Sequence, residues 1–295
     1  MSEHVEASPK FTYLEMLGSP RDDVLSIWEY LPYYSWYLRF GFQPIHGFDR
    51  TGEMVSAGSD GLVLCCEPFG VTRIQAEGWK AQMRWAAGLS GASGGSLKRL
   101  FGSLHPGDLV RGALQFFPTF FSPGNGLEDV AYSRCLNTFD LVYIPATNGD
   151  PAGRSGPRGL LPRTAAAPSA VVEDLRVVAS ALDRVMFLYG FSADRSKGYG
   201  LAGTKLVGKH GLPPGELFVA LPPSAPRIPS HMCFDDAEGL LGALNCTADR
   251  IAFQESEADS RKLAGRDDDR SKVRGIGAGP YSPRFGSIGE VEDAL

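Results

Sequence analysis

The spacing of apolar residues along the chain predicts a mixture of strands and helices. Residues 35–43 alternate between apolar and polar, which is typical of a strand. Apolar runs predict further strands over 61–67, 109–121, 140–144 and 201–207. Helical spacing predicts helices over 76–87 and 171–188, and a short one within 11–34. The fold class that follows is α+β.

The segments between these elements are rich in glycine, proline and serine. We expect 88–95 to be flexible and 145–170 to be a long surface loop, because its roughly 26 residues exceed the usual connection length. From Glu255 onward the chain is charged and glycine-rich, which predicts a mobile segment. The predicted organisation is an N-terminal extension (1–34), a core (35–250) with an insertion at 145–170, and a charged, glycine-rich mobile tail (251–295).

The composition is that of a globular protein with many turns. The 295 residues include 36 glycines and 21 prolines, about a fifth of the chain against roughly 12% on average, which argues against a helical bundle or coiled coil. No apolar run approaches the roughly 18 residues of a membrane span. The first residues lack the basic and apolar regions of a signal peptide, so we expect a cytoplasmic protein with no membrane partner.

Charge is unevenly distributed along the chain. The formal net charge of −5 excludes a protein that is basic throughout. Between Val71 and Lys205, however, there are 15 lysines and arginines against 10 acidic residues, whereas the rest of the chain has 14 against 24. A positive middle in an acidic protein is what a localised face for a polyanion would produce, although the change of sign also arises by chance.

The cysteines and histidines do not predict a metal site. Five cysteines (Cys65, Cys66, Cys135, Cys233 and Cys246) are an odd number without C-x-x-C spacing. His231 and Cys233 form one potential ligand pair, but no second pair completes four ligands, so we interpret them as structural. We expect neither a metal nor a cofactor.

Two enzyme motifs fail on their context. Ser93 fits G-x-S-x-G, but a predicted helix precedes it where a nucleophile elbow needs a strand, so we interpret the motif as a loop rather than a hydrolase site. No phosphate-binding P-loop motif occurs, and the glycines at 275–279 lack the strand and helix of a dinucleotide-binding fold. The motifs therefore give no support to a nucleotide-dependent enzyme.

The strongest motif is the glycine-rich segment 190–200, which follows a predicted helix and precedes a predicted strand. It places Arg195, Lys197 and Tyr199 among glycines, where backbone N–H groups can approach a phosphate and the tyrosine offers an aromatic face. The alternative is a glycine that ends the helix, followed by a turn with solvated charges.

Taken with two other segments, this loop resembles the RAMP superfamily, the repeat-associated RNA-binding proteins of CRISPR systems. Residues 74–84 are similar to the family's helix with a lysine and an arginine one turn apart, here Lys80 and Arg84. Residues 107–118, which include Arg111, look like its strand that leads into an aromatic-proline stretch. The resemblance over 35–210 implies a ferredoxin-like, RNA-recognition-type core with a long, thumb-like insertion.

Within that superfamily the chain resembles the Cas-seven-type backbone subunit, of type IV or type III complexes. This implies binding of guide RNA without sequence preference, head-to-tail contacts with copies of itself in a helical filament, and contacts with other CRISPR effector subunits and with a DNA or RNA target paired to the guide. The implied RNA-binding residues are Lys80, Arg84, Arg111, Arg154, Arg158, Arg163, Arg195, Ser196, Lys197, Gly198, Tyr199 and Gly200. The arginines of the 145–170 insertion would reach over the RNA of the next subunit.

Three alternatives remain open. Some type III members cleave target RNA with an aspartate after the first strand, and Asp49 is the acidic residue near that position. Because Arg50 beside it is more typical of a surface ion pair, we favour a subunit that is not an enzyme. The related processing ribonucleases use a histidine such as His46, but they usually carry two such cores. The third alternative is an α+β protein that binds no RNA.

Overall fold

A computed structural model describes residues 20–44, 63–66, 71–103, 110–121, 137–145, 166–191, 200–208, 211–223, 225 and 228–274, with 63–66, 71–73 and 258–274 described by their backbone alone. The chain divides into two compact units, Met1–Ala252 and Phe253–Leu295. Within the described part of the chain, no helix is both long and apolar enough to cross a membrane.

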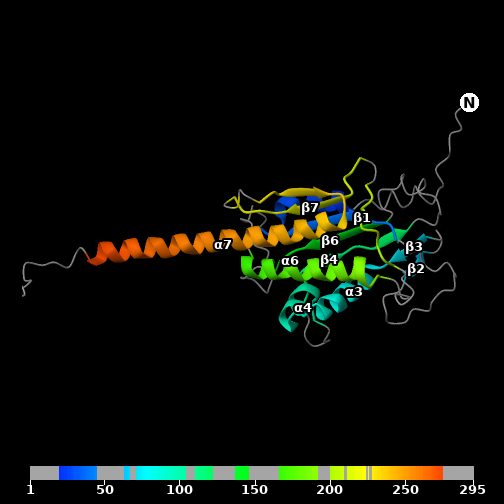
Figure 1. Ribbon diagram of the computed structural model, residues 1–295, viewed down its shortest axis with the longest axis horizontal. Helices are drawn as coiled ribbons and strands as arrows, with labels where there is room; N and C mark the ends of the chain where they lie inside the picture. Colours follow the sequence, from blue (N-terminus) through cyan, green and yellow to red (C-terminus); the bar gives the residue numbers. More distant parts are fainter. Residues whose placement is uncertain are drawn as a thin grey trace, which may run out of the picture. The chain divides into compact units, whose positions relative to one another are not determined.

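Groups of strands alternate with groups of helices in chain order (Figure 1). They are α2 (Pro20–Ser26), the 3₁₀ turn η1 (Trp28–Tyr30), β1 (Trp36–Gly41), β2 (Val63–Cys66), β3 (Val71–Ile74), α3 (Ala76–Leu89), α4 (Gly94–Phe101), β4 (Leu114–Phe116), β5 (Thr119–Phe121), β6 (Thr138–Tyr143), α6 (Pro168–Leu182), the π-helical turn η2 (Asp183–Leu188), β7 (Gly215–Val219), β8 (His231–Phe234) and α7 (Ala237–Arg274).

The main sheet has five strands in the order β4-β6-β1-β7-β8, and all its pairs are antiparallel. Along the chain its first four strands and two of the helices follow the sequence β1-α3-β4-β6-α6-β7. This order of elements, with β6 and β7 on either side of β1, is the ferredoxin-like arrangement. The predicted α+β class and ferredoxin-like core are therefore confirmed, and β8 extends the sheet by one strand.

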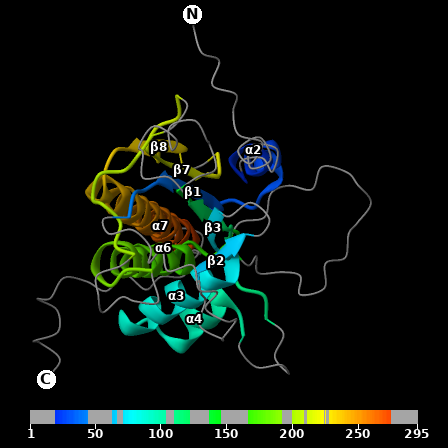
Figure 2. The same cartoon turned by 90° about the vertical axis from the view of Figure 1, so that its right-hand side faces the viewer.

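The helices cover one face of this sheet because the residues of the central strand alternate. Trp36, Leu38 and Phe40 of β1 point into a core that also contains Trp79 and Met83 of α3. Figure 2 shows α3 and α6 on this side of the sheet. Full burial of each large apolar side chain stabilises the fold by about 1.5–3 kcal/mol. The predicted buried face of the helix over 76–87 is thus confirmed.

The opposite face of the sheet is covered by the N-terminal helix α2. Val24 of α2 packs on Tyr37 and Val142, which confirms the predicted helical pattern before the first strand. Charged residues are also buried on this face, because the strand register places Arg39 between Asp140 and Glu216. Burial raises the pKa of Asp140, and the charge of Arg39 acts against this effect.

A second, three-stranded sheet of order β2-β3-β5 adjoins the core. The indole N–H of Trp79 donates to Thr119 of β5 at 2.9 Å, and the Thr119 hydroxyl donates to the carbonyl of Thr138 at 2.7 Å. These bonds satisfy buried polar groups and tie the second sheet to α3 and β6.

One predicted strand is wrong in part and another is wrong. Residues 109–121 form two short strands, β4 and β5, which belong to different sheets, with Phe117 and Pro118 between them. Residues 201–207 are not a strand: the segment makes only isolated bridges at Ala202 and Lys205. Its apolar residues Ala202 and Leu206 are buried in the helix-side core rather than in a ladder, so an apolar run alone misidentified it.

The helices also differ from the predictions in extent. The segment predicted to be flexible ends in a helix, α4, which Ser93 caps by accepting a hydrogen bond from the backbone N–H of Ser96. The helix α6 begins at Pro168, inside the predicted loop, because proline suits the first helical turn. The predicted tail is helical as far as Arg274. The helix α7 begins at Ala237, within the predicted core, and the predictions missed its buried stripe of Leu240, Leu244, Ala248 and Ile251 at helical spacing.

Candidate nucleic-acid interface

The outward face of α3 carries two of the cations expected to bind RNA. Trp79 and Met83 bury the inner face, so Lys80 is exposed and Arg84, one turn later, is half-buried on the same side. Glu77 is the acidic neighbour on this face. Lys80 makes no hydrogen bond or ion pair with a residue that the structure describes.

Arg84 links α3 to the end of α4. Its guanidinium donates to the carbonyl of Gly102 at 2.9 Å, just after the last turn of α4. Gly102 has φ +81 and lies against residues 110–112: an added Cβ would be 2.5 Å from the carbonyl oxygen of Val110. The two backbone segments approach so closely that only glycine fits at 102 and 112. Arg84 and the backbone of Arg111 therefore meet around one residue, Gly102.

A pocket of about 510 Å³ opens between α4 and the edge of the main sheet at β4. Three cations, three small residues and three other side chains line it: Lys98, Arg99, Arg111, Gly95, Gly112, Ala113, Val110, Gln115 and Ile144. Arg111 is exposed and makes no ion pair within the described ranges. The pocket therefore places the exposed Arg111 beside a glycine-rich backbone, which suits phosphate oxygens.

Arg99 is held in the pocket wall by a buried network. It donates to Asp174 of α6 at 2.7–3.1 Å, and the hydroxyl of Tyr143 donates to the same carboxylate at 2.7 Å. Burial raises the pKa of Asp174, while Arg99 and Tyr143 act against this by bonding to the charged form. The pKa of Arg99 is raised, mainly by its hydrogen bonds to Asp174. Most of the Arg99 charge is thus neutralised inside the protein.

The neighbouring Glu173 is exposed and completes this network. It accepts from the hydroxyl of Ser96 in α4 and forms an ion pair with Arg99 at 3.0 Å. The hydrogen bond from Ser96, followed by the contacts with Arg99, lowers the pKa of Glu173. These contacts join α4 to α6 and fix the orientation of the pocket wall.

Only the two ends of the glycine-rich segment 190–200 lie within the described residues. Gly190 and Gly200 have φ +81 and +80, which explains glycine at both positions. The backbone N–H of Phe191 donates to the carbonyl of Gly200 at 3.0 Å, so the ends of the loop are held together. Gln82 of α3 donates to the carbonyl of Phe191 at 2.9 Å. Gly190 therefore ends the helix, as the alternative interpretation of the motif states, and phosphate binding by the loop stays a prediction.

An exposed aromatic pair lies beside the base of this loop. Trp85 of α3 and Tyr189 contact each other edge to face at 5.6 Å, with exposed fractions of 43% and 37%. Arg184 lies over the Tyr189 ring at 6.0 Å. Leu89 of α3 and Leu188 of η2 are also exposed. Exposed rings beside cations can stack on nucleic-acid bases.

Sequence reasoning missed the aromatic pair and the two cations of α4. Trp85 follows Trp79 by six residues, so helical geometry already excludes both from one buried face. Lys98 and Arg99 end the overlooked helix α4, whose signal was the capping residue Ser93. The approach of 100–102 to 110–112 is a tertiary contact with no local signal.

Most of the other predicted RNA-binding residues lie outside the described residues. These are Arg154, Arg158, Arg163, Arg195, Ser196, Lys197, Gly198 and Tyr199, together with Asp49 and His46 of the cleavage alternatives. Of the predicted set, the structure describes Lys80, Arg84, Arg111 and Gly200. It brings the Arg84 guanidinium and the backbone of Arg111 to the same residue, Gly102, and places Lys80 one turn from Arg84.

Strand order and side-chain placement define a ferredoxin-like α+β protein with a basic face over α3, α4 and residues 110–112. No protein-family model and no curated protein sequence matches the chain. Among solved structures it is similar to one described as the crystal structure of the Csm3-Csm4 subcomplex in the type III-A CRISPR-Cas interference complex. The TM-score is 0.39 at 13% identity, over 74% of this chain and 97% of the other. A likeness at this level assigns neither a family nor a function.

Proposed function

We propose that this chain binds guide RNA as a subunit of a CRISPR ribonucleoprotein and holds the RNA backbone on the basic face over α3, α4 and residues 110–112. One observation carries the proposal: the Arg84 guanidinium bonds to the carbonyl of Gly102, and Gly102 lies against the backbone of Arg111. Arg111 is 27 positions from Arg84 in the sequence and lines a pocket together with Lys98 and Arg99. Lys80 extends this positive surface by one turn of α3. Lysine and arginine bind phosphates without reading the bases, as a subunit that accepts any guide requires.

The aromatic pair supports single-stranded rather than duplex RNA as the ligand. The rings of Trp85 and Tyr189 are on the side of α3 that faces the loop base, where Gln82 contacts Phe191. Bases of a single strand stack on such rings, whereas paired bases are buried within their helix. Cations on one side of α3 and rings on the other would hold a strand that crosses this helix.

The further parts of the proposal follow from the family resemblance. The chain would polymerise head to tail along the guide, because a heterologous contact that does not close into a ring produces a helical array. It would contact other subunits of the complex and the paired DNA or RNA target. It would not itself cleave RNA, so Asp49→Ala should leave any target cleavage by the assembled complex unchanged. Divalent-metal-dependent cleavage that is lost in Asp49→Ala would overturn that part alone.

The test is to purify the full chain from cells that carry its neighbouring genes and to sequence the RNA that remains bound. Uniform RNAs in which a repeat fragment is joined to a spacer are expected. A Lys80→Gln/Arg111→Gln variant should retain much less RNA, whereas Lys205→Gln should retain as much as the unmodified chain. Lys205 is the matched control because its side chain is exposed and its backbone forms an isolated β-bridge with Asp236, which follows β8. It therefore lies away from the β4 edge and the pocket. A folded chain without nucleic acid would overturn the proposal.

A further inference from the structure

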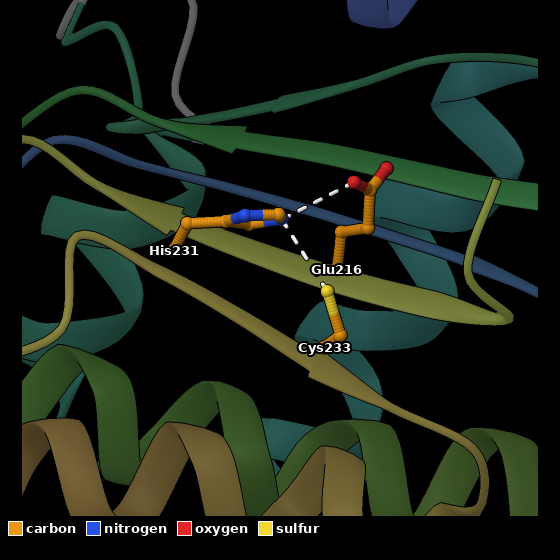
Figure 3. A group of neighbouring side chains, drawn as sticks. All are labelled: Glu216, His231 and Cys233. Carbon is orange, nitrogen blue, oxygen red and sulfur yellow. Dashed lines mark hydrogen bonds and ion pairs between the residues drawn. The ribbon is translucent and has the colours of Figure 1, made fainter.

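Three side chains with different ligand atoms meet on the surface formed by β7 and β8 (Figure 3). Glu216 comes from β7, and His231 and Cys233 come from the edge strand β8. The His231 Nε2 lies 3.2 Å from the Glu216 Oε1 and 3.6 Å from the Cys233 Sγ. The three ligand atoms all lie within 4.8 Å of one another. This trio is outside the proposed RNA-binding face and does not depend on that function.

The two separations from His231 match those between the ligands of a tetrahedral zinc ion. Zinc binds sulfur at about 2.3 Å, imidazole nitrogen at about 2.05 Å and carboxylate oxygen at about 2.1 Å. Tetrahedral angles then place sulfur and nitrogen about 3.6 Å apart, and nitrogen and oxygen about 3.4 Å apart. The observed 3.6 Å and 3.2 Å agree with these values to about 0.2 Å.

The backbone and neighbouring side chains hold the ligands in place. The antiparallel register sets Glu216 directly opposite Cys233, and strand alternation puts His231 and Cys233 on the same face. The His231 ring stacks on Phe218 with centroids 4.1 Å apart, which fixes its plane. Arg21 donates to the Glu216 carboxylate at 2.9 Å and 3.2 Å and so limits its rotation. Such outer contacts are what orient the ligands of metal sites.

Charge and access are compatible with a cation at this position. Glu216 and Asp140 are balanced by Arg21 and Arg39, so the surrounding network is close to neutral. Glu216 is 2% exposed at the base of the trio, whereas His231 is 42% exposed and Cys233 is also open to solvent. An ion can therefore enter from solvent and meet the carboxylate below.

We propose that Glu216, His231 and Cys233 bind one zinc ion, with solvent in the fourth position. A thiolate, an imidazole and a carboxylate form a ligand set that suits zinc rather than magnesium or calcium. The sequence could not show this site, because His231-x-Cys233 is only one pair and the third ligand comes from the facing strand. The ion would fasten the edge strand β8 to β7.

The test uses Co²⁺ as a spectroscopic probe on the full chain without an affinity tag. The unmodified protein and Cys246→Ser, which removes the other exposed free cysteine of the described residues, should show a thiolate-to-cobalt charge-transfer band at one equivalent, and Zn²⁺ should abolish it. Cys233→Ser should lose the band. His231→Asn should weaken Co²⁺ binding by at least about tenfold, since even outer-shell changes cost 10–100-fold.

A second measurement uses only the unmodified protein, so its result does not depend on whether a variant folds. Zn²⁺ should slow the alkylation of Cys233, followed by peptide mass spectrometry, and leave that of Cys246 unchanged. The proposal is overturned if the unmodified protein shows no charge-transfer band, if Cys233→Ser keeps it, or if Zn²⁺ protects both cysteines equally.

Discussion

Removing two cations from the proposed interface should change the salt dependence of RNA binding by a calculable amount. Lys80 and Arg111 are exposed, and neither makes an ion pair with a described residue, so Lys80→Gln and Arg111→Gln should change stability by less than about 0.5 kcal/mol each. Arg84 is left in place because its guanidinium holds the Gly102 carbonyl. Any loss of binding can then be assigned to the interface rather than to unfolding.

Each phosphate contact with single-stranded RNA contributes about 0.7 to the slope of log K against log salt. If both cations contact phosphates, the double variant should therefore lower the magnitude of this slope by about 1.4. The measurement is fluorescence anisotropy with a labelled single-stranded RNA at four or five KCl concentrations.

Trp85→Ala provides a contrasting perturbation on the same helix. Loss of one stacked base should weaken binding by about 1–3 kcal/mol, or about five- to 150-fold, at every salt concentration and leave the slope unchanged. An unchanged slope in the double variant, or an equal reduction in Lys205→Gln, would refute the assignment of Lys80 and Arg111 to phosphate binding.

Three further predictions concern the pocket wall. Asp174→Ala leaves the buried Tyr143 hydroxyl without its acceptor and should lower the free energy of unfolding in urea by about 1–3 kcal/mol. Adding Tyr143→Phe to this variant should lower it by almost nothing more, and additive losses would contradict this. Gly112→Ala should destabilise the protein by about 1–3 kcal/mol because the added Cβ would lie 2.4 Å from a backbone oxygen. Gly88→Ala is the control: this position faces open space on a helix, so the change should stabilise the protein by about 0.5–1 kcal/mol. Since the pKa of Glu173 is lowered on folding, its charge stabilises the protein above its ordinary pKa and this contribution is lost as the pH falls through the lowered value. The difference in Tm between the unmodified chain and Glu173→Gln should shrink over that acidic range, and a difference independent of pH would contradict it.

The parts of the fold that were predictable are those with a strong local pattern. The alternation around β1 and the helical spacing around Trp79 come from burial of one face, which is written directly into the sequence. The ferredoxin-like arrangement followed from a resemblance, and the strand order confirms it. The predictions missed α7, although its buried Leu240, Leu244, Ala248 and Ile251 recur at helical spacing. They also misassigned 201–207, where an apolar run packs in the core without pairing in a ladder.

The candidate sites depended more on contacts between distant segments. Lys80 and Arg84 were found because their spacing on one helix is local. Arg99 was missed because its role depends on Asp174, which lies on another helix. Glu216 was missed as a ligand because only the register of β7 and β8 places it opposite Cys233.

The π-helical turn at the end of α6 lets the residues before it stay buried while the residues after it face solvent. In η2 the backbone N–H of Tyr189 donates to the carbonyl of Arg184, five residues earlier, at 2.7 Å. Such a wide turn accommodates one extra residue, and each residue in a helix rotates the following side chains by about 100°. Val178 and Leu182 can therefore stay on the buried face of the helix while Leu188 and Tyr189 are exposed. Related sequences could gain or lose a single residue here and so re-aim the surface aromatic side chain without repacking the interior.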